Sequence, residues 1–443
     1  MQYLLSAVPI LLMSTGIFYF IRLRGFYLRH PIRTLSVLGK KPTGQGISPT
    51  RALLMALAGT LGVGNIVGVA TALSLGGAGA VFWMLLSATI AMVLKYAEIV
   101  LALKHRRWSQ AGEPCGGAPY YIQDEFARRG WRTGGKILAT IFALLCLVNT
   151  FTMGSMLQSN AVAMAIQGVF DIPVGVVGGV LSLLCIPVVW GGVKKISAVT
   201  QTIVPLMTLG FLVMCLAVIV LRWERVPTAL ASIVTQALDT HSVGGGIAGF
   251  LTSQALRYGV MRGLVSNEAG CGTAPMVHAT AQTNCPAEQG VFGLVEVFVD
   301  TILLCSITAL AILVSDSGYT SYPHDGVKTA VSAFTSVLGD WAGGFFAIAV
   351  LFFGVATIFC WAHYGMTALT YLYQPKAGRK GVWGRIFLIL YVVSVWVGAV
   401  TTPDGVWAMA DVALAVMTVI NLAVLWLMNG EVREETKEWM RRR

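Results

Sequence analysis

The residues best suited to chemistry form one run that interrupts an apolar stretch: Gly59-Thr60-Leu61-Gly62-Val63-Gly64-Asn65. Glycine lowers helix stability and lets the backbone leave the helical path, which frees carbonyl and amide groups. In a bilayer, such groups are tolerated only where they face a cavity or a bound ligand. Asn65 favours this interpretation over close packing through small residues, because an amide in an apolar span needs a polar partner. The run therefore predicts a broken helix that presents backbone groups.

A second group of candidates consists of ionisable residues within other apolar stretches. Such residues are rare in membrane spans and are paired or functional where they occur. Lys95 and Glu98 are one helical turn apart, which predicts a local ion pair. Glu296 and Asp300 share one helix face, so either one of them is protonated or a cation sits between them. His363 could titrate near neutral pH, although a hydrogen-bonded histidine is the simpler interpretation.

The remaining sequence argues against an enzyme. The eight cysteines fall singly, without a Cys-x-x-Cys pair or histidines at metal-ligand spacing. Glu268 lies in a glycine-rich segment that we expect on the cytoplasmic side, but no Ser/His/Asp constellation or phosphate-binding loop accompanies it. The repeated filter or charged rings of a channel are also missing from the sequence.

The composition is that of a membrane protein. Of 443 residues, 56% are hydrophobic and only 12% are charged, whereas soluble domains carry about 25% charged residues. The net charge of +11 arises in a few loops, so we expect the lipid bilayer as a partner and no nucleic acid. The length is typical of a secondary transporter.

Apolar runs of spanning length predict eleven transmembrane helices, each with about 20 residues or more in the bilayer. The runs are 3–23, 52–74, 78–103, 136–166, 173–190, 197–221, 246–266, 288–314, 341–372, 385–401 and 406–428. Two short amphipathic stretches, 228–238 and 327–338, are expected to lie along the membrane surface.

The distribution of lysine and arginine predicts the orientation. Most of the 31 basic residues lie in the loops after spans one, three, five and nine and in the C-terminal tail, which all fall on one side. Because cytoplasmic loops carry an excess of basic residues, we expect the N-terminus outside and the C-terminus in the cytoplasm. The protein would then be a multi-pass protein of the cell inner (plasma) membrane.

The spacing of glycine runs predicts an internal repeat. A second run, Gly244 to Phe250, follows the first by five spans, and an odd offset reverses the topology of the second half. We therefore expect an all-α polytopic membrane protein with a 5+5 inverted repeat. Its parts would be an extra N-terminal helix with a basic loop (1–45), two five-helix repeats (46–225 and 226–428) and a charged cytoplasmic tail (429–443).

Several motifs resemble those of the alanine or glycine:cation symporter family. They are the run from Gly59 to Ala70, Phe82-Trp-Met, Lys95-Tyr-Ala-Glu98, Gly116 to Ile122 and, most specifically, Arg262-Gly-Leu-Val-Ser-Asn-Glu-Ala-Gly-Cys-Gly-Thr-Ala-Pro275. The resemblance covers nearly the whole chain. It implies eleven helices, a leucine-transporter-like core and sodium-coupled uptake of small neutral amino acids such as alanine and glycine.

The resemblance also implies which residues bind the ligands. The substrate carboxylate would meet the amides near Gly62, Val63 and Gly64, beside Thr60, while Gln158 matches a family glutamine at the substrate. Trp361 matches a tryptophan that limits side-chain volume. The second glycine run would contribute Gly249 and Phe250. The cation would be bound by Ala58, Leu61, Asn65, Phe353 and Thr357.

One departure from the family pattern leaves the coupling ion open. The family has two adjacent hydroxyl residues in the ninth helix, but this chain has Ala356-Thr357. We expect sodium as the coupling ion, with a proton as the alternative in a proton-coupled or uncoupled exchanger. A protein of another class on the same fold, an amino-acid sensor or channel, is the further alternative. No other cofactor is expected.

Overall fold

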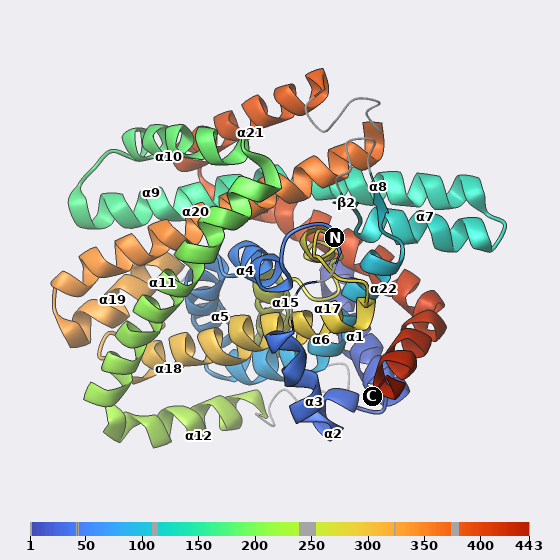
Figure 1. The fold of residues 1–443 in the computed structure, drawn as a ribbon. Helices are drawn as coiled ribbons and strands as arrows, with labels where there is room; N and C mark the ends of the chain where they lie inside the picture. The colour runs from blue at the N-terminus through green and yellow to red at the C-terminus, as the bar shows by residue number, and fades with distance from the viewer. Residues whose placement is uncertain are drawn as a thin grey trace.

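The computed structural model describes residues 2–40, 42, 44–108, 114–238, 254–322, 325–373 and 381–442, and it is almost entirely helical (Figure 1). In this part of the chain, the two-residue strands β1 (Arg107–Trp108) and β2 (Pro114–Cys115) form a single small antiparallel pair.

The helices follow the predicted apolar runs closely. The helices that overlap these runs are α1 (Gln2–Arg22), α4 (Pro49–Thr60), α5 (Val67–Gly76), α6 (Gly79–Lys104), α8 (Arg132–Phe151), α9 (Leu157–Phe170), α10 (Val174–Val189), α11 (Gly192–Leu221), α15 (Gln254–Asn267), α17 (Pro286–Val297), α18 (Ser306–Val314), α20 (Trp341–Tyr373), α21 (Val382–Val400) and α22 (Pro403–Arg441). The other helices are α2 (Phe26–Arg29), α3 (Pro31–Ser36), α7 (Ala118–Arg128), α12 (Val226–Ala237), α16 (Pro275–His278) and α19 (Gly326–Leu338). The 3-10 segments are η1 (Val37–Gly39), η2 (Val63–Asn65) and η4 (Trp223–Arg225), and the π-helical segments are η3 (Thr152–Met156) and η5 (Phe298–Cys305).

Among the described helices, seven are long and apolar enough to cross a membrane, and the bent pair of α4 and α5 makes up to eight. The apolar parts of α1 and α10 are shorter, at Ala7–Arg22 and Val174–Val189, and α15 has 14 described residues. Each predicted span overlaps a described helix, but the number eleven stays a prediction.

The helices form two packed groups. In one, α6 packs against α15 and α17, and α5 also contacts α15. In the other, α20 packs against α8 and α9, and α21 packs against α9 and α10. Figure 1 shows the second group above the first, with α4 between them. Because α4 contacts both α17 and α20, the broken helix lies where the two groups meet.

The ion pair predicted between Lys95 and Glu98 is wrong. Lys95 pairs instead with Glu296 of α17, with 3.2 Å between Nζ and Oε1, and the other oxygen of Glu296 lies 2.9 Å from Nε2 of His278. Glu98 accepts hydrogen bonds from the amide of Gly272 and the side chain of Asn421. All these carboxylates are buried, and a buried charge takes the partner that helix packing brings to it.

The C-terminal part of α22 is attached to the protein rather than extended into solvent. Glu431 contacts His105 at 3.0 Å, and Trp439 is buried against Phe26. Burial alone would lower the pKa of His105, but its hydrogen bonds to Asp124 and Glu431 outweigh burial and raise that pKa to about 9. The ring is therefore charged at neutral pH, and its ion pairs join the end of α6 to α7 and α22.

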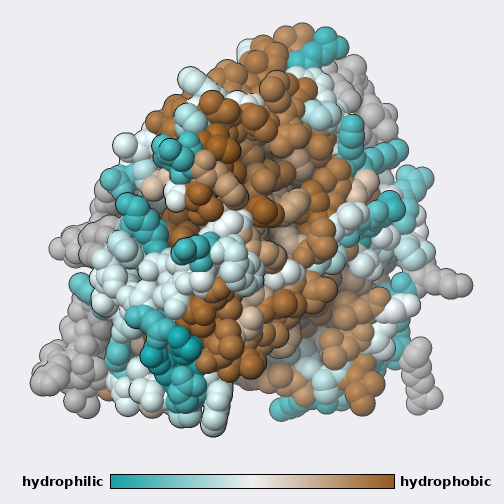
Figure 2. Space-filling view, turned by 90° about the vertical axis from the view of Figure 1, so that its left-hand side faces the viewer, coloured by the Kyte–Doolittle hydropathy of each residue, from teal (hydrophilic) through white to brown (hydrophobic). Residues whose placement is uncertain are grey.

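The surface carries many exposed apolar side chains, such as Leu183 of α10 and Leu206 and Leu209 of α11. Figure 2 shows a broad hydrophobic area over the centre of one face, with hydrophilic side chains gathered towards its edges. Such a continuous apolar surface is typical of a protein whose neighbours are lipid chains.

The buried ion pair between Lys95 and Glu296 generates a stability prediction. Lys95→Met should lower the free energy of unfolding by about 3–5 kcal/mol, because it leaves the buried Glu296 carboxylate with His278 as its remaining partner. Replacing both residues by methionine should recover most of this loss. The measurement is thermal unfolding of the detergent-solubilised protein, with Lys104→Met, at the partly exposed end of the same helix, as the control. Equal losses in the single and the double variant would contradict the prediction.

Candidate functional site

The predicted break at Gly59 to Asn65 is confirmed. Helix α4 ends at Thr60, η2 spans Val63–Asn65 and α5 begins at Val67. The two halves are bent by 62° relative to each other. The residues of the break are almost all buried, so the freed backbone groups must find partners inside the protein.

Two of these groups are bound by side chains from other helices. The amide of Val63 donates to Oε1 of Gln158 at 3.1 Å, and the carbonyl of Ala58 accepts from the hydroxyl of Thr357 at 2.9 Å. In a continuous helix, the Ala58 carbonyl would accept from the amide of Gly62, which donates to Thr60 instead. The hydroxyl of Thr60 points back to the Ala56 carbonyl at 3.4 Å.

Thr357 brings three oxygen atoms together. Its Oγ1 lies 2.9 Å from the carbonyl oxygen of Ala58 and 3.0 Å from that of Phe353. A hydroxyl has one proton to donate, so it can satisfy only one of these two carbonyls at a time. Leu61, the other carbonyl predicted here, is buried at the end of α4.

Glycine is required at position 62 by close approach. A Cβ atom there would lie 2.7 Å from Oγ1 of Thr357 and 2.9 Å from Oε1 of Gln158. Any side chain would therefore displace the two groups that bind the freed backbone.

Asn65 lies in a second polar cluster on the other side of the break. Its Nδ2 lies 2.9 Å from Oγ of Ser266 and 2.7 Å from Oδ1 of Asp300. Ser266 and Thr301 both donate to Oδ2 of Asp300. Oδ1 of Asn65 has no hydrogen-bond partner among the described residues. Asp300 is thus a buried carboxylate supplied with neutral donors only, in the part of the chain that the structure describes.

A buried irregular segment, 268–274, follows the seventh predicted span. Glu268 has a positive φ of 52°, and Gly270 and Gly272 have φ values of 90° and 78°. Glu268 is fully buried, so this segment is packed inside the protein, and its place on the cytoplasmic side stays a prediction. Ser266, just before it, contacts Asn65, so the two interruptions meet. Gly249 and Phe250 lie outside the described residues.

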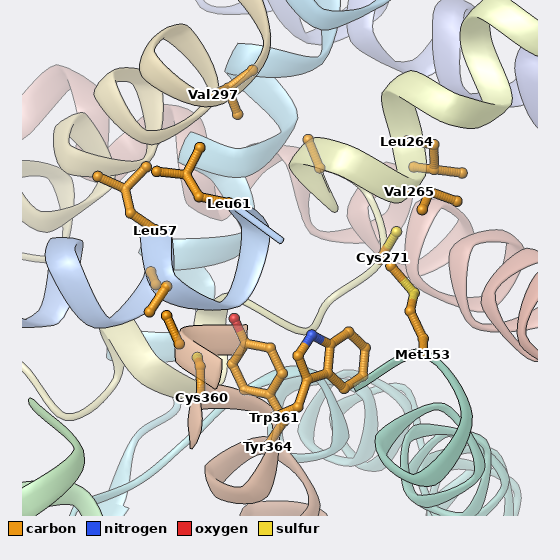
Figure 3. Close-up of a cluster of buried hydrophobic side chains, with 14 of the residues drawn as sticks. Leu57, Leu61, Met153, Leu264, Val265, Cys271, Val297, Cys360, Trp361 and Tyr364 are labelled. Atoms are coloured by element: carbon orange, nitrogen blue, oxygen red, sulfur yellow. The ribbon is translucent and has the colours of Figure 1, made fainter. Parts of the chain in front are cut away.

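Trp361 and Tyr364 point from α20 towards the space between α4 and the end of α15 (Figure 3). Their rings pack edge to face, with centroids 5.1 Å apart. Trp361 is fully buried, and its indole nitrogen has no hydrogen-bond partner among the described residues. Gly154 allows this position, because a Cβ atom there would lie 2.4 Å from Cβ of Trp361.

Two π-helical segments position these side chains. η3 lies just before Gln158, and the carbonyl of Met153 within it accepts from Nε2 of Gln158 at 3.0 Å. η5 contains Asp300 and Thr301. Such segments often occur at functional sites, because the extra residue in each turn redirects nearby side chains.

The structure thus brings Ala58, Gly62, Val63, Gln158 and Thr357 together. The sequence did not predict that Ser266 and Asp300 contact Asn65. Both residues were nevertheless conspicuous, since Ser266 belongs to the most specific motif and Asp300 is an ionisable residue in an apolar run. The sequence left open whether a cation sits between Glu296 and Asp300. In this structure the two carboxylates have separate partners, so such a cation is not needed.

The pattern of the sodium:alanine symporter family matches residues 1–443. The chain belongs to this family. It is therefore a membrane transporter and not an enzyme.

Individual relatives agree with this assignment. An uncharacterised transporter of Haemophilus influenzae is 37% identical, covering 98% of this chain and 93% of its own. The sodium/alanine symporter AgcS of Methanococcus maripaludis is 35% identical, covering 97% and 93%. A crystal structure of a manganese transporter of Eremococcus coleocola has a TM-score of 0.53 at 16% identity, covering 85% of this chain and 76% of its own. That last likeness concerns the fold alone.

The close approach at Gly62 generates a prediction about ligand binding. Gly62→Ala should abolish binding of labelled alanine in the presence of sodium, because the new methyl group pushes Thr357 and Gln158 from the break. Gly68→Ala, in the same broken helix, is the matched control, since its Cβ would meet no atom within 4 Å. The measurement is equilibrium binding to purified protein. Equal binding by the two variants would show that the break is not the site.

Proposed function

We propose that this protein is a secondary active transporter that imports small neutral amino acids, such as alanine and glycine, together with sodium by alternating access. One observation supports this most strongly. At the break in the second predicted span, a backbone amide and a backbone carbonyl are held 3.1 Å and 2.9 Å from the polar side chains of Gln158 and Thr357. The carboxylate of a zwitterionic amino acid would accept a hydrogen bond from the freed amide. A cation would bind the freed carbonyl oxygen.

The substrate would replace an internal hydrogen bond. Its carboxylate would accept from the amide of Val63, where Oε1 of Gln158 now accepts, and Gln158 would turn its amide towards the ligand. Gly64 adds an amide at the same turn. The indole of Trp361 lies on the neighbouring helix and would limit the space for the substrate side chain.

The coupling ion has two candidate positions. One is the three oxygens of Thr357, Ala58 and Phe353, where the missing hydroxyl at Ala356 leaves room for a water ligand. The other is the cluster of Asn65, Ser266 and Asp300, where a buried carboxylate would take up either a sodium ion or a proton. The alternative of proton coupling therefore rests on Asp300. His363 supports it less, because its Nε2 lies 3.4 Å from a backbone carbonyl, that of Met276.

The packing supports the 5+5 repeat as a proposal. The second and seventh predicted spans contact each other, as do the third and eighth, the fourth and ninth, and the fifth and tenth. Contacts between elements five spans apart are expected of an inverted repeat. We retain eleven spans, an outside N-terminus and a plasma-membrane location on this basis and on the distribution of basic residues. A sensor on this fold would bind its ligand without accumulating it.

Imposed ion gradients test the coupling ion. Purified protein in proteoliposomes should accumulate labelled alanine under an inward sodium gradient, and Thr357→Ala should abolish the stimulation by sodium because it removes the hydroxyl from the three-oxygen position. Ala356→Ser, which adds a hydroxyl beside it, should increase the apparent sodium affinity. Uptake that ignores sodium, follows an inward proton gradient and is lost in Asp300→Asn would establish the proton-coupled alternative. Binding without accumulation would establish the sensor.

Competition by other amino acids tests size selection. Glycine and alanine should inhibit the uptake of labelled alanine, whereas leucine and phenylalanine should not, because the indole of Trp361 fills the space they need. Trp361→Ala should admit the larger competitors while alanine uptake continues, since the carboxylate contacts remain. Phe346→Ala is a control that removes a buried aromatic ring from the same helix. Strong inhibition of the unmodified protein by leucine would overturn this model of the site.

A further inference from the structure

A cavity of about 320 Å³ leads to the break from the end of the molecule where α22 begins. Helices α5, α9 and α15 and the first turns of α19 and α22 surround it, and Val63 forms part of its wall. Its volume is within the range of small-molecule sites. The charged side chains that line it are Arg262, Asp325 and Asp404.

Arg262 has hydrogen-bond donors that nothing in the described structure uses. Its Nε and Nη1 are buried and have no hydrogen-bond partner among the described residues. The nearest carboxylate, that of Asp411, lies 3.9 Å from Nη1, which is too long for a hydrogen bond. The guanidinium is nevertheless held in place, because its Cζ lies 4.5 Å from the ring centroid of Trp407. Arginine presents its donors as a planar fork that matches a carboxylate.

Asp404 supplies the complementary charge. It lies in the first turn of α22, is exposed, and makes no hydrogen bond or ion pair with any described residue. Asp325 differs, because its carboxylate accepts from the amide of Lys328 at 2.9 Å and so caps α19. The cavity lining therefore contains a guanidinium with two unused hydrogen-bond donors and a carboxylate that no described residue binds.

We propose that this cavity is a first binding site for a zwitterionic α-amino acid on its way to the break, with Arg262 binding the α-carboxylate and Asp404 the α-ammonium group. This inference rests on the proposed function. Arg262 precedes Ser266 by one helical turn of α15, about 6 Å, and Ser266 contacts Asn65 in the break. The first site would recognise only the α-carboxylate and the α-ammonium group, which every α-amino acid carries. Selection by size is then left to the deeper site beside Trp361.

The effect of removing Asp411 distinguishes substrate binding by Arg262 from a purely structural pairing of Arg262 with Asp411. If Arg262 served only to hold α15 against α22, removing Asp411 would harm transport as much as removing Arg262. If Arg262 binds the substrate, Asp411 competes with the substrate for the guanidinium. Its removal should then leave the KM unchanged or lower it.

The test is the concentration dependence of labelled alanine uptake into proteoliposomes, with binding to the purified protein measured in parallel. Arg262→Gln should raise the KM about tenfold, the effect of losing about 1.4 kcal/mol of charge-assisted hydrogen bonding, with the maximal rate within about twofold. Asp404→Asn should raise the KM in the same direction. Arg257→Gln removes the same charge from the same helix outside the cavity lining, and it should leave the KM unchanged.

The outcomes separate this inference from the proposed function. If the unmodified protein neither binds nor transports alanine, the proposed function fails and this inference fails with it. If the unmodified protein transports alanine but Arg262→Gln and Asp404→Asn keep its KM, or Asp411→Asn raises the KM as much as Arg262→Gln, this inference alone is overturned. Should Arg262→Gln not yield folded protein, Arg262→Lys, which keeps the charge but loses the fork, should give an intermediate KM, and an unchanged KM would overturn the inference.

Discussion

A backbone that leaves the helical path inside a membrane must have its amide and carbonyl groups bound within the protein. The break between α4 and α5 meets this constraint with side chains from distant parts of the chain. Gln158 binds the freed amide of Val63, and Thr357 binds the freed carbonyl of Ala58. The proposed site follows from this arrangement. A ligand that binds the same backbone amide or carbonyl would replace the side chain that binds it here.

The break also joins the two groups of helices. On one side, Asn65 contacts α15 and the π-helical segment η5 through Ser266 and Asp300. On the other side, Val63 and Ala58 contact α9 and α20. A ligand bound at the break would therefore touch both groups at once. In the proposed transport cycle, such a ligand would couple its binding to a movement of one group against the other.

Buried charges contribute to the structure in a different way. Lys95 of α6, Glu296 of α17 and His278 of α16 are completely buried, so they join α16 to two helices of the first group. Glu98 binds the irregular segment after α15 through the amide of Gly272. These contacts stabilise a second interruption of the backbone next to the first. Two further ionisable residues, Arg262 and Asp404, line the cavity that leads to the break.

The sequence by itself determined the membrane class, the positions of most helices, the break at Gly59 to Asn65 and the family. These features depend on local properties: apolar runs, the conformational freedom of glycine and motifs read along the chain. The tertiary structure decided which partner each polar group took. Lys95 has Glu98 one turn away in sequence, yet it pairs with Glu296, because helix packing and not helical periodicity places the nearest carboxylate. The burial of Glu268 and the contact between Asn65 and Asp300 also depend on helix packing, because residues far apart in the sequence come into contact only once the helices pack.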